Sequence, residues 1–209
     1  MMIDTAFTGR CGFASRKGFT LMELLAVIAV LAVLAAILVP AVTVSRSFQL
    51  TQAVQQMADV FSLARQSAMA QNCIVEVRFY LTKNVEGATA CRSYQLFQVS
   101  GSGMVSPLTR ISYLGDGVIA GTGGSLSSLL DTSKRERHAG AFPVPGAGTD
   151  YQYFSFAFLP DGRTNLPAME EWFVTLHLKS DGDGRTTPPP NFGTVQVDPV
   201  NGAVRTFRP

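Results

Sequence analysis

Residues 16–25 read RKGFTLMELL, and an apolar run continues from there to Val44. One carboxylate, Glu23, lies near the start of this run, and the 22 residues from Leu24 to Ser45 carry no charge. Such a length is enough to span a hydrocarbon core of about 30 Å. A charge at bilayer depth costs roughly 2.5–3.5 kcal/mol on insertion scales. The sequence therefore predicts a membrane-spanning helix in which Glu23 needs a partner.

This segment resembles the amino-terminal signal of type IV prepilins and of type II secretion pseudopilins. In that signal a basic leader ends in Gly, cleavage occurs before Phe, and the fifth mature residue is Glu. The matching residues here are Gly18, Phe19, Thr20, Leu21, Glu23 and Leu24. The resemblance implies that a prepilin peptidase in the inner membrane cuts between Gly18 and Phe19 and methylates the new amine of Phe19.

The same resemblance implies roles in assembly for two further residues. Glu23 would pair with the amino terminus of a neighbouring subunit, which satisfies a buried charge and fixes the axial register. Pro40 lies at a position where pilins commonly have a proline, and it removes a backbone donor from the helix. The alternative is an uncleaved single-pass anchor, but such an anchor needs neither the Gly-Phe junction nor Glu23.

Composition limits the chain to one anchored helix and one modest domain. It has 209 residues, of which 46% are hydrophobic and 15% charged. Loss of residues 1–18 lowers the Lys and Arg count from 17 to 14 and the Asp and Glu count from 15 to 14. The mature side chains then sum to zero charge, which argues against a general nucleic-acid-binding surface.

Periodicity changes once along the chain. Apolar residues first recur every three or four positions, which predicts an amphipathic helix whose stripe packs on a sheet; a partner-binding face is the alternative. The stripe is Leu50, Val54, Met57, Phe61, Ala64 and Ala68. After Asn72 the period becomes two, and Val75, Val77, Phe79 and Leu81 predict a strand with one buried face.

Further strands are predicted from alternation and turn signals. They cover 94–99, 111–114 with 117–119, 153–159, 172–178, and a terminal hairpin of 194–197 with 203–207. Residues 121–150 are rich in Gly, Ser and Pro and predict a long loop, with a helical turn near 126–130. The expected fold class is α+β and pilin-like, with a long amino-terminal helix on an antiparallel sheet.

The order of elements is similar to that of minor pseudopilins of the GspH and FimT type, and the segment 158–164 strengthens the likeness. Pilin-like cassette proteins of verrucomicrobial bacteria are also similar. The expected organisation is a leader (1–18), a transmembrane and filament-core helix (19–45), an amphipathic helix (46–72) and a β-rich periplasmic head (73–209).

Cysteine, histidine and acidic residues give weak signals. A hairpin centred near Gly87 would place Cys73 and Cys91 at its opposite ends, which favours two unbridged thiols over a disulfide. His177 is expected on the solvent face of a strand, and His138 in a solvated loop or against an anionic partner. Asp181-Gly182-Asp183-Gly184 resembles the start of a calcium loop but lacks its later Glu, so a flexible turn is favoured.

These observations predict a structural minor pilin or pseudopilin without a catalytic, metal or cofactor site. The predicted partners are a prepilin peptidase, other pilins and the inner membrane, with no small-molecule substrate. A DNA-capturing FimT-like pilin is the first alternative, and a membrane-anchored enzyme is the second. The residues that would contact DNA or another anionic partner are Lys134, Arg135, Arg137, Arg205 and Arg208.

Overall fold

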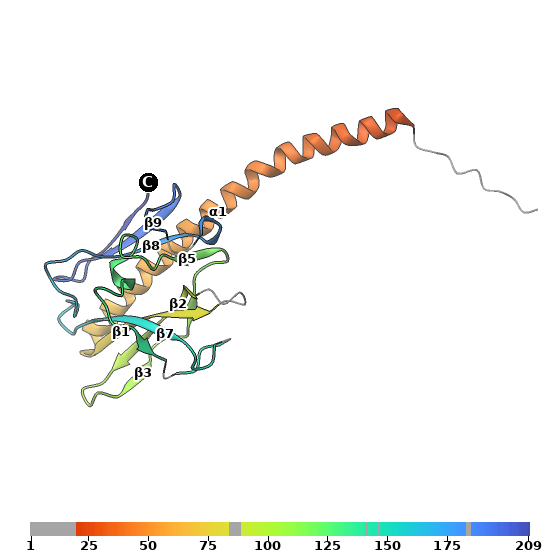
Figure 1. The fold of residues 1–209 in the computed structure, drawn as a ribbon. Helices are drawn as coiled ribbons and strands as arrows, with labels where there is room; N and C mark the ends of the chain where they lie inside the picture. Colours follow the sequence, from red (N-terminus) through yellow and green to blue (C-terminus); the bar gives the residue numbers. More distant parts are fainter. Residues whose placement is uncertain (1–19, 84–88, 141, 146, 183–184) are drawn as a thin grey trace, which may run out of the picture. The chain divides into compact units, whose positions relative to one another are not determined.

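The computed structural model describes residues 20–83, 89–140, 142–145, 147–182 and 185–209, without the side chains of residues 36–45. It divides into two compact units, Met1–Val42 and Thr43–Pro209, and we call the second unit the head. The long helix α1 (Leu21–Gln71) contributes residues 21–42 to the first unit and residues 43–71 to the head (Figure 1).

The head contains an antiparallel sheet with ten strands among the described residues. The main path runs in the order β10-β9-β8-β5-β2-β1-β7-β6, and β3 and β4 also pair with β2. The strands are β1 (Ile74–Lys83), β2 (Thr89–Val99), β3 (Val105–Pro107), β4 (Ser112–Tyr113), β5 (Val118–Ala120), β6 (His138–Ala139), β7 (Gln152–Phe158), β8 (Trp172–Leu178), β9 (Phe192–Val197) and β10 (Val204–Phe207). The long helix and the antiparallel sheet confirm the predicted α+β class.

The apolar stripe of α1 packs on one face of this sheet, as predicted. All six stripe residues are at most 3% exposed. The ring of Phe61 meets the rings of Phe79 and Phe156 edge-on, with centroids 6.0 and 5.4 Å apart. Gly193 on β9 leaves space for the helix, because a Cβ there would lie 2.4 Å from Cγ2 of Val54. The helix and the sheet therefore share one core.

The prediction that β1 has a single buried face is wrong. Val75, Val77, Phe79 and Leu81 are buried as expected, but Arg78 and Tyr80 on the other face are also buried, at 5% and 0% exposure. The list of residues in this second cluster is Tyr80, Phe97, Val144, Tyr151 and Tyr153, with Phe142 packed against it. The segment before β7, which shows no periodicity, folds over this face and provides the cover.

The hairpin of β1 and β2 has nearly the predicted register. Ile74 pairs with Val99, and Leu81 pairs with Cys91 after an irregularity at Tyr80. Cys73 precedes the first of these pairs, so the two cysteines lie at opposite ends of the hairpin. The placement expected from the sequence is confirmed.

His177 is not on a solvent face, and this prediction is wrong. Its side chain on β8 is fully buried. A Cβ on Gly121 would lie 3.4 Å from Nε2 of His177 and 2.8 Å from Leu126, so this turn covers the imidazole. The same segment continues into the short helix η1 (Ser128–Leu130), at the place where a helical turn was expected. Two-residue periodicity finds the strand but not the segment that crosses it.

Candidate functional site

The first turn of α1 is closed by a reciprocal pair of side chains, Thr20 and Glu23. Oε2 of Glu23 accepts the backbone N–H of Thr20 at 2.9 Å and its hydroxyl at 3.0 Å. The Thr20 hydroxyl in turn accepts the N–H of Glu23 at 3.2 Å. This is a capping box, which satisfies N–H groups that the first turn of a helix leaves without partners. Gly18 and Phe19, the predicted processing residues, lie outside the described residues.

Beyond this cap, α1 presents apolar side chains to solvent on every side. The large ones between Leu21 and Leu34 are 50–81% exposed. The side chain of Pro40, the second predicted assembly residue, lies outside the described residues. Among helices with described side chains, none is long and apolar enough to cross a membrane. Exposure of the apolar side chains of residues 21–34 to water is nevertheless unfavourable.

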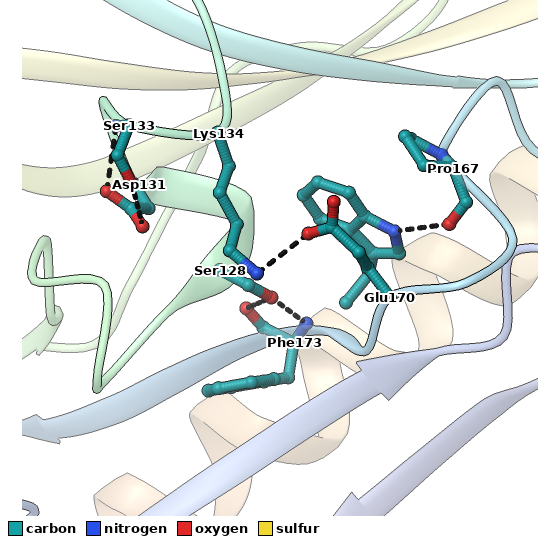
Figure 2. A network of polar contacts seen from close by, with 8 residues as sticks. Ser128, Asp131, Ser133, Lys134, Pro167, Glu170 and Phe173 are labelled. Carbon is teal, nitrogen blue, oxygen red and sulfur yellow. Dashed lines mark hydrogen bonds and ion pairs between the residues drawn. The ribbon is translucent and has the colours of Figure 1, made fainter.

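Three of the predicted DNA-contacting residues lie together in the segment before β6, where they contact the head itself. Nζ of Lys134 lies 2.7 Å from Oε2 of Glu170, and Figure 2 shows this ion pair. Arg135 donates to the backbone carbonyl of Ser155, and burial lowers the pKa of its guanidinium. The guanidinium carbon of Arg137 lies 5.4 Å from the ring centre of Phe154. These contacts tie the segment to the sheet.

The other two basic residues lie near the carboxyl terminus. Arg205 lines a cleft together with Glu170, Glu171 and Asp198. Arg208 donates to the hydroxyl of Thr51 on α1 and, at 2.8 Å, to Oδ1 of Asn191. Lys134 thus pairs with a carboxylate and Arg205 shares its cleft with three, an arrangement that gives little support to a phosphate-binding surface.

Among the residues that the structure describes, the remaining candidates from the sequence show no ligand-binding geometry. In the described part of the chain, no group of three or more His, Cys, Asp or Glu residues is placed to hold a metal. Asp183 and Gly184, half of the weak calcium motif, lie outside that part. His138 is exposed as expected, but it belongs to the short strand β6 and its ring lies 5.3 Å from that of Tyr153.

Sequence reasoning missed one polar site, a buried ion pair inside the second cluster. NH2 of Arg78 lies 2.7 Å from Oε2 of Glu76, and both side chains are at most 16% exposed. The guanidinium carbon lies 4.2 Å from the ring centre of Phe97 and 4.6 Å from that of Tyr153. Because these aromatic faces and Glu76 surround it, Arg78 acts as a structural clamp rather than as a free cation.

Comparison with known proteins places the amino-terminal segment in a class. The prokaryotic N-terminal methylation motif matches residues 13–39, which confirms the prepilin-type signal predicted from the sequence. The amino-terminal segment thus carries a prepilin-type methylation motif, and a head with a helix on an antiparallel sheet follows it in the chain. No curated protein matches the sequence.

Structural comparison gives matches to solved structures, and two of these are of the same protein. One is described as the structure of the minor pseudopilin EpsH from the type 2 secretion system of Vibrio cholerae; it has 13% identity and a TM-score of 0.45, and the match covers 77% of this chain and 98% of that chain. The other is a crystal structure of the same pseudopilin, with 13% identity and a TM-score of 0.46, covering 78% of this chain and 96% of that chain.

Proposed function

We propose that this chain is a structural minor pilin or pseudopilin subunit of a type II secretion or type IV pilus-like machine. The observation that carries the proposal is the methylation motif over residues 13–39 in front of a folded head. The subunit is anchored in the inner membrane by residues 19–45, its head lies in the periplasm, and it joins a filament with other pilins. It performs no chemistry of its own.

Processing by a prepilin peptidase is the first step of this proposal. Intact-mass measurement of the full chain, expressed with and without such a peptidase, tests it. We expect loss of residues 1–18 and gain of one methyl group on Phe19. A Gly18→Leu variant is the matched control, because a side chain at the cleavage site should block cutting while the head still folds. An unchanged mass for the natural chain, alongside complete processing of a known prepilin, would contradict the proposal.

Assembly through Glu23 is the second step. The capping box gives Glu23 a role within its own helix, and the proposal adds pairing of its charge with a neighbour's amino terminus. The two roles are separable because a capping box accepts Gln as well as Glu. Glu23→Gln keeps the cap and removes the charge, whereas Glu23→Ala removes both.

We expect both variants to enter the membrane and both to be depleted from the filament fraction of cells. Glu23→Gln is the informative variant, and Thr20→Ser, which keeps the capping hydroxyl, is its control. Filament incorporation of Glu23→Gln at the natural level would show that the cap is sufficient and that the charge has no part in assembly.

DNA capture, the alternative function, has less support. Lys134 is paired with Glu170, and Arg205 shares its cleft with three carboxylates. We therefore expect no salt-sensitive DNA binding by the full chain at low ionic strength. Binding that weakens steeply as salt is added would favour DNA capture over a purely structural role.

A further inference from the structure

Two turns of the head pack against the last two turns of α1. Nε of Arg65 donates to the carbonyl of Gly162, in the turn after β7, at 3.3 Å. A Cβ on Gly162 would lie 3.0 Å from Sδ of Met69, and a Cβ on Gly202, in the β9–β10 turn, would lie 2.2 Å from the Gly162 carbonyl. The end of the helix and the two turns therefore form one continuous surface.

Three large apolar side chains are exposed on or beside these turns. Met69 is 48% exposed, Val200 in the β9–β10 turn is 57% exposed, and Met169 in the loop before β8 is 98% exposed. Single exposed apolar residues are ordinary, but a group of them on adjoining turns indicates a contact site. Methionine is also common at binding surfaces, because its side chain adapts to different partners.

The loop that carries Met169 is fixed on both sides. Nε1 of Trp172 donates to the carbonyl of Pro167 at 2.9 Å, and Glu170 forms its ion pair with Lys134. Figure 2 shows the Lys134–Glu170 ion pair and the hydrogen bond to the carbonyl of Pro167. The fold thus holds Met169 in solvent at a defined place, so that binding there costs little loop ordering.

A cleft of about 220 Å³ lies between this loop and the β9–β10 turn. Its wall includes Ala168 and Val200 as apolar residues and Glu170, Glu171, Asp198 and Arg205 as charged ones. Pockets for drug-sized ligands hold about 300–1,000 Å³, so this cleft suits a single side chain. Glu170 is already paired with Lys134, which leaves the carboxylates of Glu171 and Asp198 against the guanidinium of Arg205. This excess of negative charge favours a cationic side chain.

We propose that this helix-end surface, formed by Met69, Met169, Val200 and the acidic cleft, binds a segment of a partner protein that carries a basic side chain between apolar ones. The basic group enters the cleft beside Glu171 and Asp198, and the apolar groups cover Met169 and Val200. This goes beyond the proposed filament role, because it names a contact of the head with a partner of stated chemistry. It does not depend on removal of the leader.

Photocrosslinking tests the proposal on the full chain in detergent micelles. Benzoylphenylalanine replaces Met169 in one variant and Met104 in the matched control, since Met104 is also an exposed methionine, at 70% exposure, but precedes β3. The probes are two biotinylated tripeptide amides, acetyl-Leu-Arg-Leu and acetyl-Leu-Glu-Leu. We expect the arginine peptide to label position 169 in preference to position 104, and the glutamate peptide to label neither.

A charge-neutral variant completes the test. The double variant Glu171→Gln with Asp198→Asn removes two carboxylates. In the natural chain Oδ1 of Asp198 accepts the N–H groups of Val200 and Asn201 at 2.9 and 3.2 Å. Asparagine at position 198 keeps an oxygen that can accept these bonds. Labelling by the arginine peptide should fall about two- to thirtyfold, as expected for the loss of two solvent-exposed ion pairs. The denaturation midpoint should stay unchanged.

Three outcomes would overturn the proposal: equal labelling by the two peptides, equal labelling at positions 169 and 104, or labelling that the double substitution leaves unchanged. Because the readout is peptide capture, failure here is distinct from failure of the proposed function, which is measured by cleavage and filament incorporation.

Discussion

The two parts of α1 contrast in what covers their apolar side chains. Between Leu21 and Leu34 the large apolar residues are at least half exposed, and they lie all around the helix. Between Leu50 and Ala68 the six stripe residues are buried against the sheet, whereas Leu63, outside the stripe, is 45% exposed. The second part satisfies its hydrophobic surface within the chain. The first part leaves its apolar surface uncovered by the described residues of this chain, which is unfavourable in water.

Removal of a stripe side chain should have the largest effect. Phe61→Ala deletes a ring that contacts Phe79 and Phe156, and it is expected to destabilise the head by about 3–5 kcal/mol. Leu63→Ala is the matched control on the same helix, because Leu63 is 45% exposed, and its cost should stay within about 0.5 kcal/mol. Denaturant unfolding of the full chain measures both. Equal losses would mean that the stripe is not the core of the head.

A charge in the first part of α1 should leave the head unaffected. Val30→Asp places a carboxylate among exposed apolar side chains, and at a bilayer centre this costs roughly 2.5–3.5 kcal/mol on insertion scales. We expect a smaller membrane fraction in flotation assays, with Val30→Leu as the control. The unfolding midpoint of the head should not change. A lowered midpoint would show that residues 21–42 stabilise the head and would remove the contrast between the two parts.

This contrast also explains how much the sequence could predict. Side chains that repeat with the period of a helix or a strand were assigned correctly: the stripe of α1 and the face of β1 that carries Phe79. Where a non-periodic segment provides the cover, prediction failed, as it did for Tyr80 in contact with Tyr151 and for His177 beneath Gly121. Burial by such segments depends on contacts between residues far apart in the sequence.

The candidate sites divide in the same way. The methylation motif is local, so residues 13–39 could be recognised from the sequence alone. The cap of Glu23 is equally local, since Thr20 lies three residues before it, although the sequence analysis did not identify it. The acidic cleft joins Glu171 to Asp198 across two turns, and no periodic signal in the sequence brings these turns together.

Replacement of His177, whose burial the strand periodicity did not predict, should have a smaller effect on stability. Its Nδ1 lies 3.0 Å from the carbonyl of Leu178, but its buried Nε2 has no hydrogen-bond partner among the described residues. A buried polar atom without a partner costs about 1–3 kcal/mol, which offsets the one bond that the ring makes. His177→Leu should therefore be neutral or stabilising by about 1 kcal/mol in denaturant unfolding.

The exposed His138 is the control for this substitution, and His138→Leu should change stability by no more than about 0.5 kcal/mol. A clear loss of stability in His177→Leu alone would mean that the imidazole has a structural role that a side chain of similar size does not replace.

The smallest expected effect on stability is in the turn after β7, which contacts the carboxyl-terminal end of α1 through Gly162 and Arg65. Oδ1 of Asp161 accepts the N–H of Arg163 at 3.0 Å, Oδ2 accepts its Nε–H at 2.7 Å, and these bonds lower the pKa of the carboxyl. A carboxyl with a lowered folded-state pKa stabilises the fold above its unfolded pKa, and this contribution is lost as pH falls through the folded value.

Asp161→Asn keeps an acceptor for the Arg163 N–H but removes the charge. The variant should therefore be slightly less stable at neutral pH. The gap between its unfolding midpoint and that of the natural chain should begin to narrow as the pH falls below the ordinary carboxyl pKa of 3.8 and should close only below the lowered folded-state pKa. A gap that stays constant across this range would assign the effect to turn geometry, and the contact between Gly162 and Arg65 would then hold the helix end without help from the charge.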